Sequence, residues 1–287
     1  MAYKKIIFLL GSVVLLGLFI YLFYFPYAYQ LKFKSELSPY SIYSFIHENT
    51  NDIKEETDMF RMTQILKNEK NQDVKLKWEI EYNGEISQIR IKVNFTKEQW
   101  KEKLKLLTFG STLLDITIER IKEMYTRMSA DLNSYRWTMP KSDQLSSSDC
   151  LCVFLESKIR DKPRLMNQHV DQLAYYAQNI IPQAPRLYIK SINFLEQSFS
   201  YEFCFPLADG EKRNTLPTEY YIKNQPSIGE NSSRFYGNFA ATPRFWANLY
   251  DSLKIEQKEI KYPIAEVFLD SPFSGKEDKE WQSILYF

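Results

Sequence analysis

The sequence predicts a chain of the α+β class, in which an apolar N-terminal helix precedes two soluble units built on antiparallel sheets. Three observations lead to this prediction. An uncharged run extends from Ile6 to Phe25, strict alternation of apolar and charged residues marks a hairpin at residues 74–95, and one strand–helix–strand–strand pattern occurs twice after residue 150. The expected organisation is an anchor (1–26), a first unit (27–137), a linker (138–149) and a second unit (150–287).

Charge and motifs exclude several classes of function. The 37 basic and 36 acidic residues give a net charge of +1, with no basic block beyond the N-terminus and no helix-turn-helix or zinc-finger pattern, so we expect no nucleic-acid partner. The chain has no glycine-rich phosphate loop, no Gly-x-Ser-x-Gly elbow and no clustered histidines. We therefore expect no cofactor and no metal. The 20 Tyr, 20 Phe and 5 Trp suit large cores and apolar ligand cavities.

The three cysteines are Cys150, Cys152 and Cys204. Cys150 and Cys152 share one face of a predicted strand, where neighbouring positions are poorly placed for a disulfide. Our main interpretation is that all three are buried, inert thiols. A disulfide from Cys204 to either of the other two is the alternative.

Residues 6–25 have the length and composition of a membrane span. Twenty residues at 1.5 Å each match a hydrocarbon core of about 30 Å. A cleavable signal peptide is the alternative, but its apolar region would end in small residues, whereas this one ends in YLFYFPYAY. Lys4 and Lys5 precede the span, and Lys32 and Lys34 follow it. We expect an uncleaved single-pass membrane anchor with a cytoplasmic N-terminus and an extracytoplasmic soluble part.

The first unit opens with alternation at residues 27–34 and a short helix near residues 38–46. Val74 to Tyr82 alternate strictly, and Asn83-Gly84 predicts a two-residue type I′ turn into a returning strand at residues 89–95. Apolar residues then repeat at helical spacing over residues 112–132. This order of elements resembles the SRPBCC (START-like, polyketide-cyclase-like) superfamily. The resemblance implies a helix-grip fold that binds a ligand, keeps a reduced cavity or serves as a spacer.

The second unit contains the repeated pattern. Proline precedes the first paired strand of each copy, at Pro185 and Pro263, and the polar stretch Lys141–Asp149 precedes both copies. Neither copy could bury its sheet alone, so we expect the two to pack about a pseudo-two-fold axis. The first copy comprises a strand at 150–157, a helix at 163–179 and strands at 187–194 and 199–205. The second comprises a strand at 228–237, a helix at 243–255 and strands at 264–269 and 281–287.

Three segments of this unit carry a more specific resemblance: Tyr236-Gly237, the strand Glu266-Val267-Phe268-Leu269-Asp270, and the segment Tyr201–Pro206. They resemble the GyrI-like effector-binding domain, which is the ligand domain of bacterial multidrug-sensing transcription activators. We see no pattern in these residues for the DNA-binding headpiece of those activators, so we expect that their transcriptional role does not transfer. The resemblance implies a domain for lipophilic or cationic small molecules.

The resemblance also implies a site. In the family, the glutamate of the third motif meets the positive charge of lipophilic cations, which implies that Glu266 faces the ligand. A carboxylate in an apolar, aromatic cavity favours a cation because it has few other partners. The alternative is a structural glutamate bonded to nearby backbone or to a lysine. The candidate aromatic walls, each of which could instead be core, are Tyr188, Tyr236, Phe245, Trp246, Tyr250 and Phe268.

The sequence thus predicts a membrane-anchored small-molecule-binding protein rather than an enzyme. One alternative is a GyrI-like hydrolase of electrophilic xenobiotics, in which Glu266 activates water with help from the Tyr188 hydroxyl. The other is a protein-interaction module held at the membrane.

Overall fold

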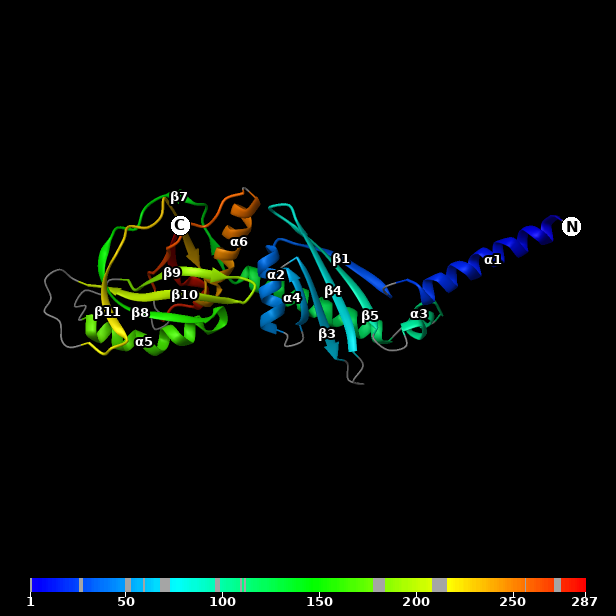
Figure 1. Ribbon diagram of the computed structural model, residues 1–287, viewed down its shortest axis with the longest axis horizontal. Helices are drawn as coiled ribbons and strands as arrows, with labels where there is room; N and C mark the ends of the chain where they lie inside the picture. Colours follow the sequence, from blue (N-terminus) through cyan, green and yellow to red (C-terminus); the bar gives the residue numbers. More distant parts are fainter. Residues whose placement is uncertain are drawn as a thin grey trace. The chain divides into compact units, whose positions relative to one another are not determined.

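The computed structural model describes residues 2–25, 28–49, 53–58, 60–67, 73–95, 99–108, 110, 112–177, 184–207, 216–255, 257–270 and 275–287. These residues form an α+β protein with six α-helices and antiparallel sheets (Figure 1). The chain divides into two compact units, Met1–Arg127 and Met128–Phe287.

Helix α1 (Ala2–Phe23) is the apolar N-terminal element of the first unit. Its segment Ile6–Phe23 has a mean hydropathy of 2.8 and none of it is buried inside the protein. By length and composition this helix could cross a membrane, a property that it shares with signal sequences.

The first unit contains a five-stranded antiparallel sheet with the order β1-β5-β4-β3-β2. The strands near residues 29–35, 74–82 and 89–95 agree with the sequence prediction, whereas β2 and β3 were not predicted. The strands are β1 (Tyr29–Ser35), β2 (Ile53–Asp58), β3 (Arg61–Lys67), β4 (Asp73–Tyr82) and β5 (Ser87–Phe95).

The β4–β5 turn differs from the predicted two-residue type I′ turn. Tyr82 pairs with Ser87, so four residues connect the strands. Gly84 has a positive φ of 99°. The Asn83 side chain accepts hydrogen bonds from the backbone N–H groups of Glu85 (3.1 Å) and Ile86 (2.8 Å). This local capping by asparagine favours the longer turn.

Alternate residues of β4 and β5 form the buried face of this sheet, as the alternation predicted. Helix α2 (Pro39–Asn49) follows β1, and helices α3 (Gln99–Thr108) and α4 (Thr112–Asn133) follow β5. Tyr125 of α4 contacts Phe33 of β1 edge-on, with 5.2 Å between ring centroids. The long predicted helix is therefore present and lies against the first strand.

The second unit contains a larger antiparallel sheet with the order β11-β8-β10-β9-β13-β14-β12-β6, and β7 also pairs with β12. Helix α5 (Lys162–Ala177) follows β8, and helix α6 (Thr242–Ile255) follows β12. The 3₁₀ helices η1 (Ile159–Asp161) and η2 (Phe239–Ala241) precede α5 and α6, and η3 (Asp278–Glu280) precedes β14. The strands are β6 (Arg136–Trp137), β7 (Lys141–Ser142), β8 (Ser148–Lys158), β9 (Arg186–Asn193), β10 (Ser198–Pro206), β11 (Tyr220–Gln225), β12 (Asn231–Tyr236), β13 (Ile264–Phe268) and β14 (Gln282–Tyr286).

Two groups of four elements occupy mirrored positions in this sheet. The group β8-α5-β9-β10 places its strands in the order β8-β10-β9, and the group β12-α6-β13-β14 places its strands in the order β12-β14-β13. Strands β9 and β13 pair at the centre. The predicted elements of both copies lie within a few residues of these positions, and residues 178–179 of the first predicted helix lie outside the described residues.

The segment predicted as a linker, residues 138–149, takes part in this sheet. Strand β7 pairs with β12, and Leu145, which is buried, forms a bridge with Ile228. The residues just before it also belong to the unit, because Trp137 pairs with Phe235. The structure differs from the prediction here because a polar segment can still supply backbone hydrogen bonds to an open sheet edge.

Cysteines 152 and 204 lie opposite each other on β8 and β10 and form a disulfide. Cys150 is a buried free thiol whose pKa is raised, mainly by burial. The interpretation of three inert thiols is therefore wrong for Cys152 and Cys204.

Candidate functional site

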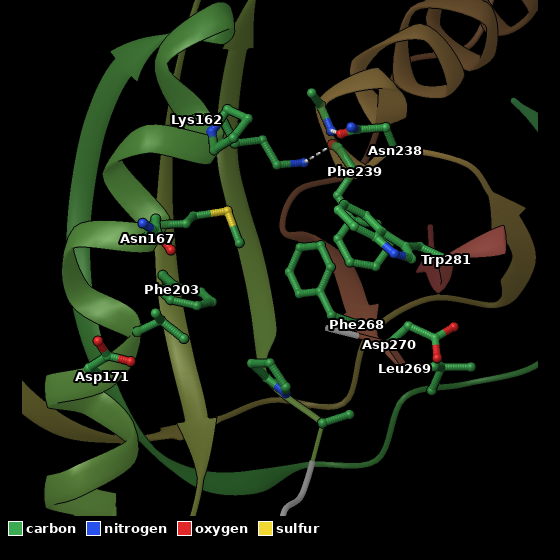
Figure 2. A pocket seen from close by; sticks show the side chains of 16 residues that line it. Lys162, Asn167, Asp171, Phe203, Asn238, Phe239, Phe268, Leu269, Asp270 and Trp281 are labelled. Carbon is green, nitrogen blue, oxygen red and sulfur yellow. Dashed lines mark hydrogen bonds between the residues drawn. The ribbon is translucent and has the colours of Figure 1, made fainter. Parts of the chain in front are cut away.

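A cavity of about 500 Å³ lies beside α5 in the second unit (Figure 2). One wall is a single face of α5, and the opposite wall comes from η2 and the end of β13. Because both mirrored groups of elements contribute, the sheet positions the two walls. The lining residues are Lys162, Pro163, Met166, Asn167, Val170, Asp171, Ala184, Pro185, Phe203, Asn238, Phe239, Ala240, Phe268, Leu269, Asp270 and Trp281.

Aromatic rings dominate the wall opposite α5. Phe239 lies 4.9 Å from Phe268 and 5.4 Å from Trp281 between ring centroids, so the three rings form one cluster. Phe203 of β10 lies on the α5 side of the cavity (Figure 2). Such walls bind apolar ligands by removing flat apolar surface from water.

A fully buried ion pair lies at the Lys162 end of the cavity. The Glu266 carboxylate is 0% exposed and accepts a hydrogen bond from Lys162 Nζ (2.5 Å). It also accepts bonds from the Thr242 hydroxyl (2.8 Å) and Trp246 Nε1 (2.6 Å). Lys162 in turn donates to Thr242 Oγ1 (2.6 Å) and to the Phe239 carbonyl (3.4 Å). Both charged groups are thus saturated with partners from within the unit.

Two similar helix starts bring this pair together. Lys162 begins α5 and Thr242 begins α6, and each follows a 3₁₀ turn and precedes a proline, Pro163 or Pro243. Proline suits the first turn of a helix because its missing N–H has no intrahelical partner there. Lys162 and Thr242 therefore approach the β13 glutamate from the two groups of elements.

Electrostatically, the Lys162 end of the cavity is balanced. Burial lowers the pKa of Lys162, and the nearby Glu266 charge and hydrogen bond only partly oppose this effect. The Lys162 ammonium also lies 5.8 Å from the Phe268 ring. Because lysine and glutamate neutralise each other, this end presents no net charge to a ligand.

Acidic groups lie at the other end. Figure 2 shows Asp171 of α5 and Asp270 far from Lys162, on opposite walls. Asp270 pairs with Lys276 (2.6 Å) and accepts a bond from the Gln282 N–H (2.9 Å). Asp171 is exposed and has no ion pair among the residues that the structure describes. This end of the cavity therefore carries a negative charge at Asp171 that no ion pair balances within the described part of the chain.

The predicted site residues are only partly assembled by the structure. Phe268 lines the cavity, and Trp246 and Glu266 lie behind it, where they border a void of about 10 Å³. The lysine pairing of Glu266 is the alternative that the sequence left open for it.

The remaining predicted aromatics are engaged elsewhere. Tyr236 lies under the Arg136 guanidinium at 4.8 Å, and Tyr250 lies 4.8 Å from Phe194. Phe245 packs on Trp137, Trp246 and Phe287. None of these rings lines the 500 Å³ cavity.

The pair proposed for hydrolysis, Glu266 and Tyr188, is separated by the sheet. Tyr188 pairs with Ala265, and Glu266 pairs with Leu187. Paired residues share a face and neighbouring residues along a strand alternate, so Tyr188 and Glu266 point to opposite faces. The Tyr188 hydroxyl lies 3.3 Å from Arg186 and 4.0 Å from the Cys150 sulfur.

Sequence reasoning assigned neither the residues of the α5 wall nor the two aspartates to a binding site. Met166 and Val170 lie four positions apart on a predicted helix, which signals an apolar face but not a cavity. Pro163 signalled the helix start. The pairing of Lys162 with Glu266 joins residues 104 positions apart and left no local signal.

A second buried carboxylate, Glu202, shares a sheet face with Tyr188 rather than with Glu266, since Glu202 pairs with Tyr188 across β10 and β9. It accepts hydrogen bonds or ion pairs from Lys190 (2.8 Å), Lys223 (2.7 Å) and Gln225 (2.6 Å). Burial alone would raise the pKa of Glu202, but these three partners outweigh burial and lower the pKa to about 2.

No protein-family model and no curated protein matches this sequence. Solved structures with a similar course of the chain include the C-terminal domain of EcmrR, at 11% identity and a TM-score of 0.40, covering 53% of this chain and 96% of that one. A hydrolase from Listeria innocua has 9% identity and a TM-score of 0.35, covering 51% and 89%. SAV2435 bound to tetraphenylphosphonium has 12% identity and a TM-score of 0.33, covering 52% and 92%. At these identities the similarity concerns the fold alone.

Proposed function

We propose that this protein binds lipophilic small molecules in the cavity beside α5 and is held at a membrane by α1. The cavity itself carries the proposal. Its volume of about 500 Å³ lies within the range of known ligand sites, and its aromatic cluster offers apolar surface to a ligand. In this proposal the second unit is a GyrI-like effector-binding domain.

The charges of the residues around the cavity indicate which ligands it can accept. The Lys162–Glu266 pair is internally neutral, while Asp171 contributes a negative charge at the other end for which the described ranges contain no ion-pair partner. An anionic ligand would be repelled there, and a cation would be attracted through a partly solvated path. We therefore propose neutral or cationic lipophilic ligands, with Asp171 rather than Glu266 supplying the preference for a cation.

The mirrored strand order supports a duplicated domain. The two groups of elements meet at the β9–β13 pair, and their helices begin with similar 3₁₀–helix steps at Lys162 and Thr242. These features support a pseudo-two-fold axis between the copies. For the first unit, the short helix after β1 and the long helix α4 after β5 support a helix-grip domain of the SRPBCC type.

Two features support an exported soluble part. Disulfides persist mainly in oxidising compartments, and Cys152 and Cys204 form one. Lys4 and Lys5 precede the apolar segment, which favours a cytoplasmic N-terminus. The protein would then be a single-pass membrane protein with both units outside the cytoplasm.

The binding proposal is tested by calorimetric titration of the full chain in nanodiscs with tetraphenylphosphonium and its neutral relative triphenylphosphine oxide. Ala240 lines the cavity and is exposed, so Ala240→Trp should occupy ligand space without disturbing the core. We expect it to weaken both ligands at least about tenfold, or about 1.4 kcal/mol. Tyr175→Trp is the matched control, because Tyr175 is 72% exposed on the same helix as Asp171 but outside the cavity.

Asp171→Asn should weaken the cation about three- to tenfold and leave the neutral ligand unchanged, as expected for a partly solvated charge. Unchanged affinity in Ala240→Trp, or binding of neither probe by the native chain, would contradict the proposal.

A further inference from the structure

Helix α3 (Gln99–Thr108) of the first unit has an exposed apolar stripe. Trp100, Leu104 and Leu107 are 41%, 39% and 54% exposed. Their spacing of four and three residues places them on one side of the helix. These side chains are therefore not used to build the core of the unit.

The same helix is attached to the C-terminal end of α1. The Lys103 ammonium is buried and donates to the carbonyl oxygens of Tyr21 (3.0 Å), Leu22 (3.5 Å) and Phe25 (2.7 Å). The last carbonyls of a helix lack intrahelical donors, so this lysine satisfies groups that would otherwise need other donors. Its ammonium also lies 5.4 Å from the Tyr21 ring. Helix α3 is thus fixed to the place where the apolar segment ends.

The attachment of α3 to the end of α1 determines how deep the exposed stripe would lie in a bilayer that α1 spans. Ile6–Phe23 is 18 residues long, which corresponds to about 27 Å and nearly fills a hydrocarbon core. Phe23 then lies near the boundary of the core. Trp100 stacks on Phe23 with 6.3 Å between ring centroids, and tryptophan is favoured at this boundary because its ring is partly apolar and partly polar.

Charged residues accompany the stripe. Lys101 lies with its ammonium 5.6 Å from the Trp100 ring, and Lys105, which pairs with Glu102, is 58% exposed in its side chain. Long lysine side chains can keep their apolar stems near lipid while their ammonium groups reach phosphates. The helix therefore combines an apolar stripe with a local excess of positive charge.

We infer that α3 lies in the headgroup layer of the leaflet from which α1 emerges, with Trp100, Leu104 and Leu107 against the acyl chains. The inference rests on the proposed anchoring by α1. The partner is the lipid surface itself, and α1 and α3 together attach the first unit to the bilayer through two elements.

The test uses the full chain in nanodiscs of phosphatidylcholine and phosphatidylglycerol. Leu107→Cys and Lys105→Cys are compared for their rates of reaction with a membrane-impermeant maleimide. Leu107 is 54% exposed as a residue and the Lys105 side chain is 58% exposed, so both positions are open to solvent in the protein alone, but Lys105 does not belong to the stripe. We expect little reaction of the maleimide with the native cysteines, because Cys150 is buried and the other two form a disulfide. We expect Leu107→Cys to react at least about tenfold more slowly.

A second measurement avoids new cysteines. Brominated lipid should quench a component of the tryptophan emission that disappears in Trp100→Phe, whereas Trp78, which is 1% exposed, should not be quenched. Equal maleimide rates for the two cysteine variants would overturn the inference and leave the stripe open to a protein partner. Carbonate washing separates the two proposals: a chain that stays in the membrane pellet with equal rates disproves only the placement of α3, whereas a released chain disproves the anchor.

Discussion

At the residue scale, Lys162 and Glu266 depend on each other because each supplies the counterion for the other's buried charge. Their side chains are 2% and 0% exposed, so neither charge can be balanced by water. A buried pair of this kind adds little net stability over an apolar pair, but the loss of one member leaves a buried charge without its partner. We infer that the pair, which joins α5 of one group to β13 of the other, contributes more to how the two groups fit together than to net stability.

Glu266→Gln should lower the free energy of unfolding by about 3–5 kcal/mol, because Lys162 would keep a buried charge that lacks its counterion. The double variant Lys162→Met/Glu266→Gln should recover most of this loss, since both charges are removed together. Urea denaturation followed by tryptophan fluorescence measures both. Equal stability of Glu266→Gln and the native chain would show that the two groups do not form an ion pair.

Because the pKa of Glu202 is lowered in the folded state, we expect the free energy of unfolding to fall in acid. Its pKa is lowered to about 2 in the folded state from an ordinary value of 4.5, so its stabilising contribution is present above pH 4.5. That contribution is lost as the pH falls from 4.5 towards 2, and it amounts to at most about 3 kcal/mol. Unfolding free energies of the second unit, measured by urea at pH 6 and pH 3, should show this decrease.

Glu202→Gln is the control for this pH dependence. The variant removes the titrating group and should flatten the slope between pH 6 and pH 3, at the cost of lower stability at pH 6. A variant that keeps the native slope would assign the acid sensitivity to other carboxylates.

At the element scale, the sequence predicts those strands whose side chains alternate between core and solvent. β4 and β5 were predicted from this alternation, and β9, β10 and β13 from the repeated strand–helix–strand–strand pattern. β2 was missed because its sequence, IKEETD, is mostly charged and shows no periodicity. Helix α3 was missed because it is short and its apolar residues do not face the core.

The candidate site was less predictable than the strands for a physical reason. The cavity exists because α5 and the end of β13, which follows it by about 90 residues, lie on opposite sides of it, and no local pattern in the sequence encodes that arrangement. Phe268 could be proposed from its strand motif. Asp171, Phe239 and Trp281 come together only through tertiary packing, so the sequence did not indicate that they line a cavity.

At the scale of the whole molecule, the second unit begins earlier than the polar stretch at residues 141–149 suggested. Tyr135 stacks on Phe235 with 6.0 Å between ring centroids. Gly237 has a φ of +139°, and a Cβ there would lie 2.7 Å from Cβ of Tyr135. This glycine is needed because the segment before β6 packs directly on its backbone.

A fragment of residues 128–287 should therefore be more stable than a fragment of residues 142–287. The shorter fragment lacks Tyr135 and Trp137, each of which covers apolar surface of the unit, and its unfolding free energy should be lower by about 3–5 kcal/mol. Urea denaturation of the two purified fragments compares them directly. Equal stabilities would place the start of the unit after residue 141, as the sequence predicted.

The central pairing of β9 with β13 has a consequence for the order in which the molecule is built. The β9–β10 hairpin connects strands that are close in sequence, but Ile189 pairs with Ile264, which lies far along the chain, beyond α6. We expect contacts of such long range to form after the local hairpin, because closing a long loop costs entropy. The cavity has one wall from each group of elements, so it is complete only once β9 has paired with β13. A ligand in the cavity would contact both groups of elements. It would therefore favour the arrangement in which β9 and β13 are paired over one in which the two groups have formed but are not yet joined.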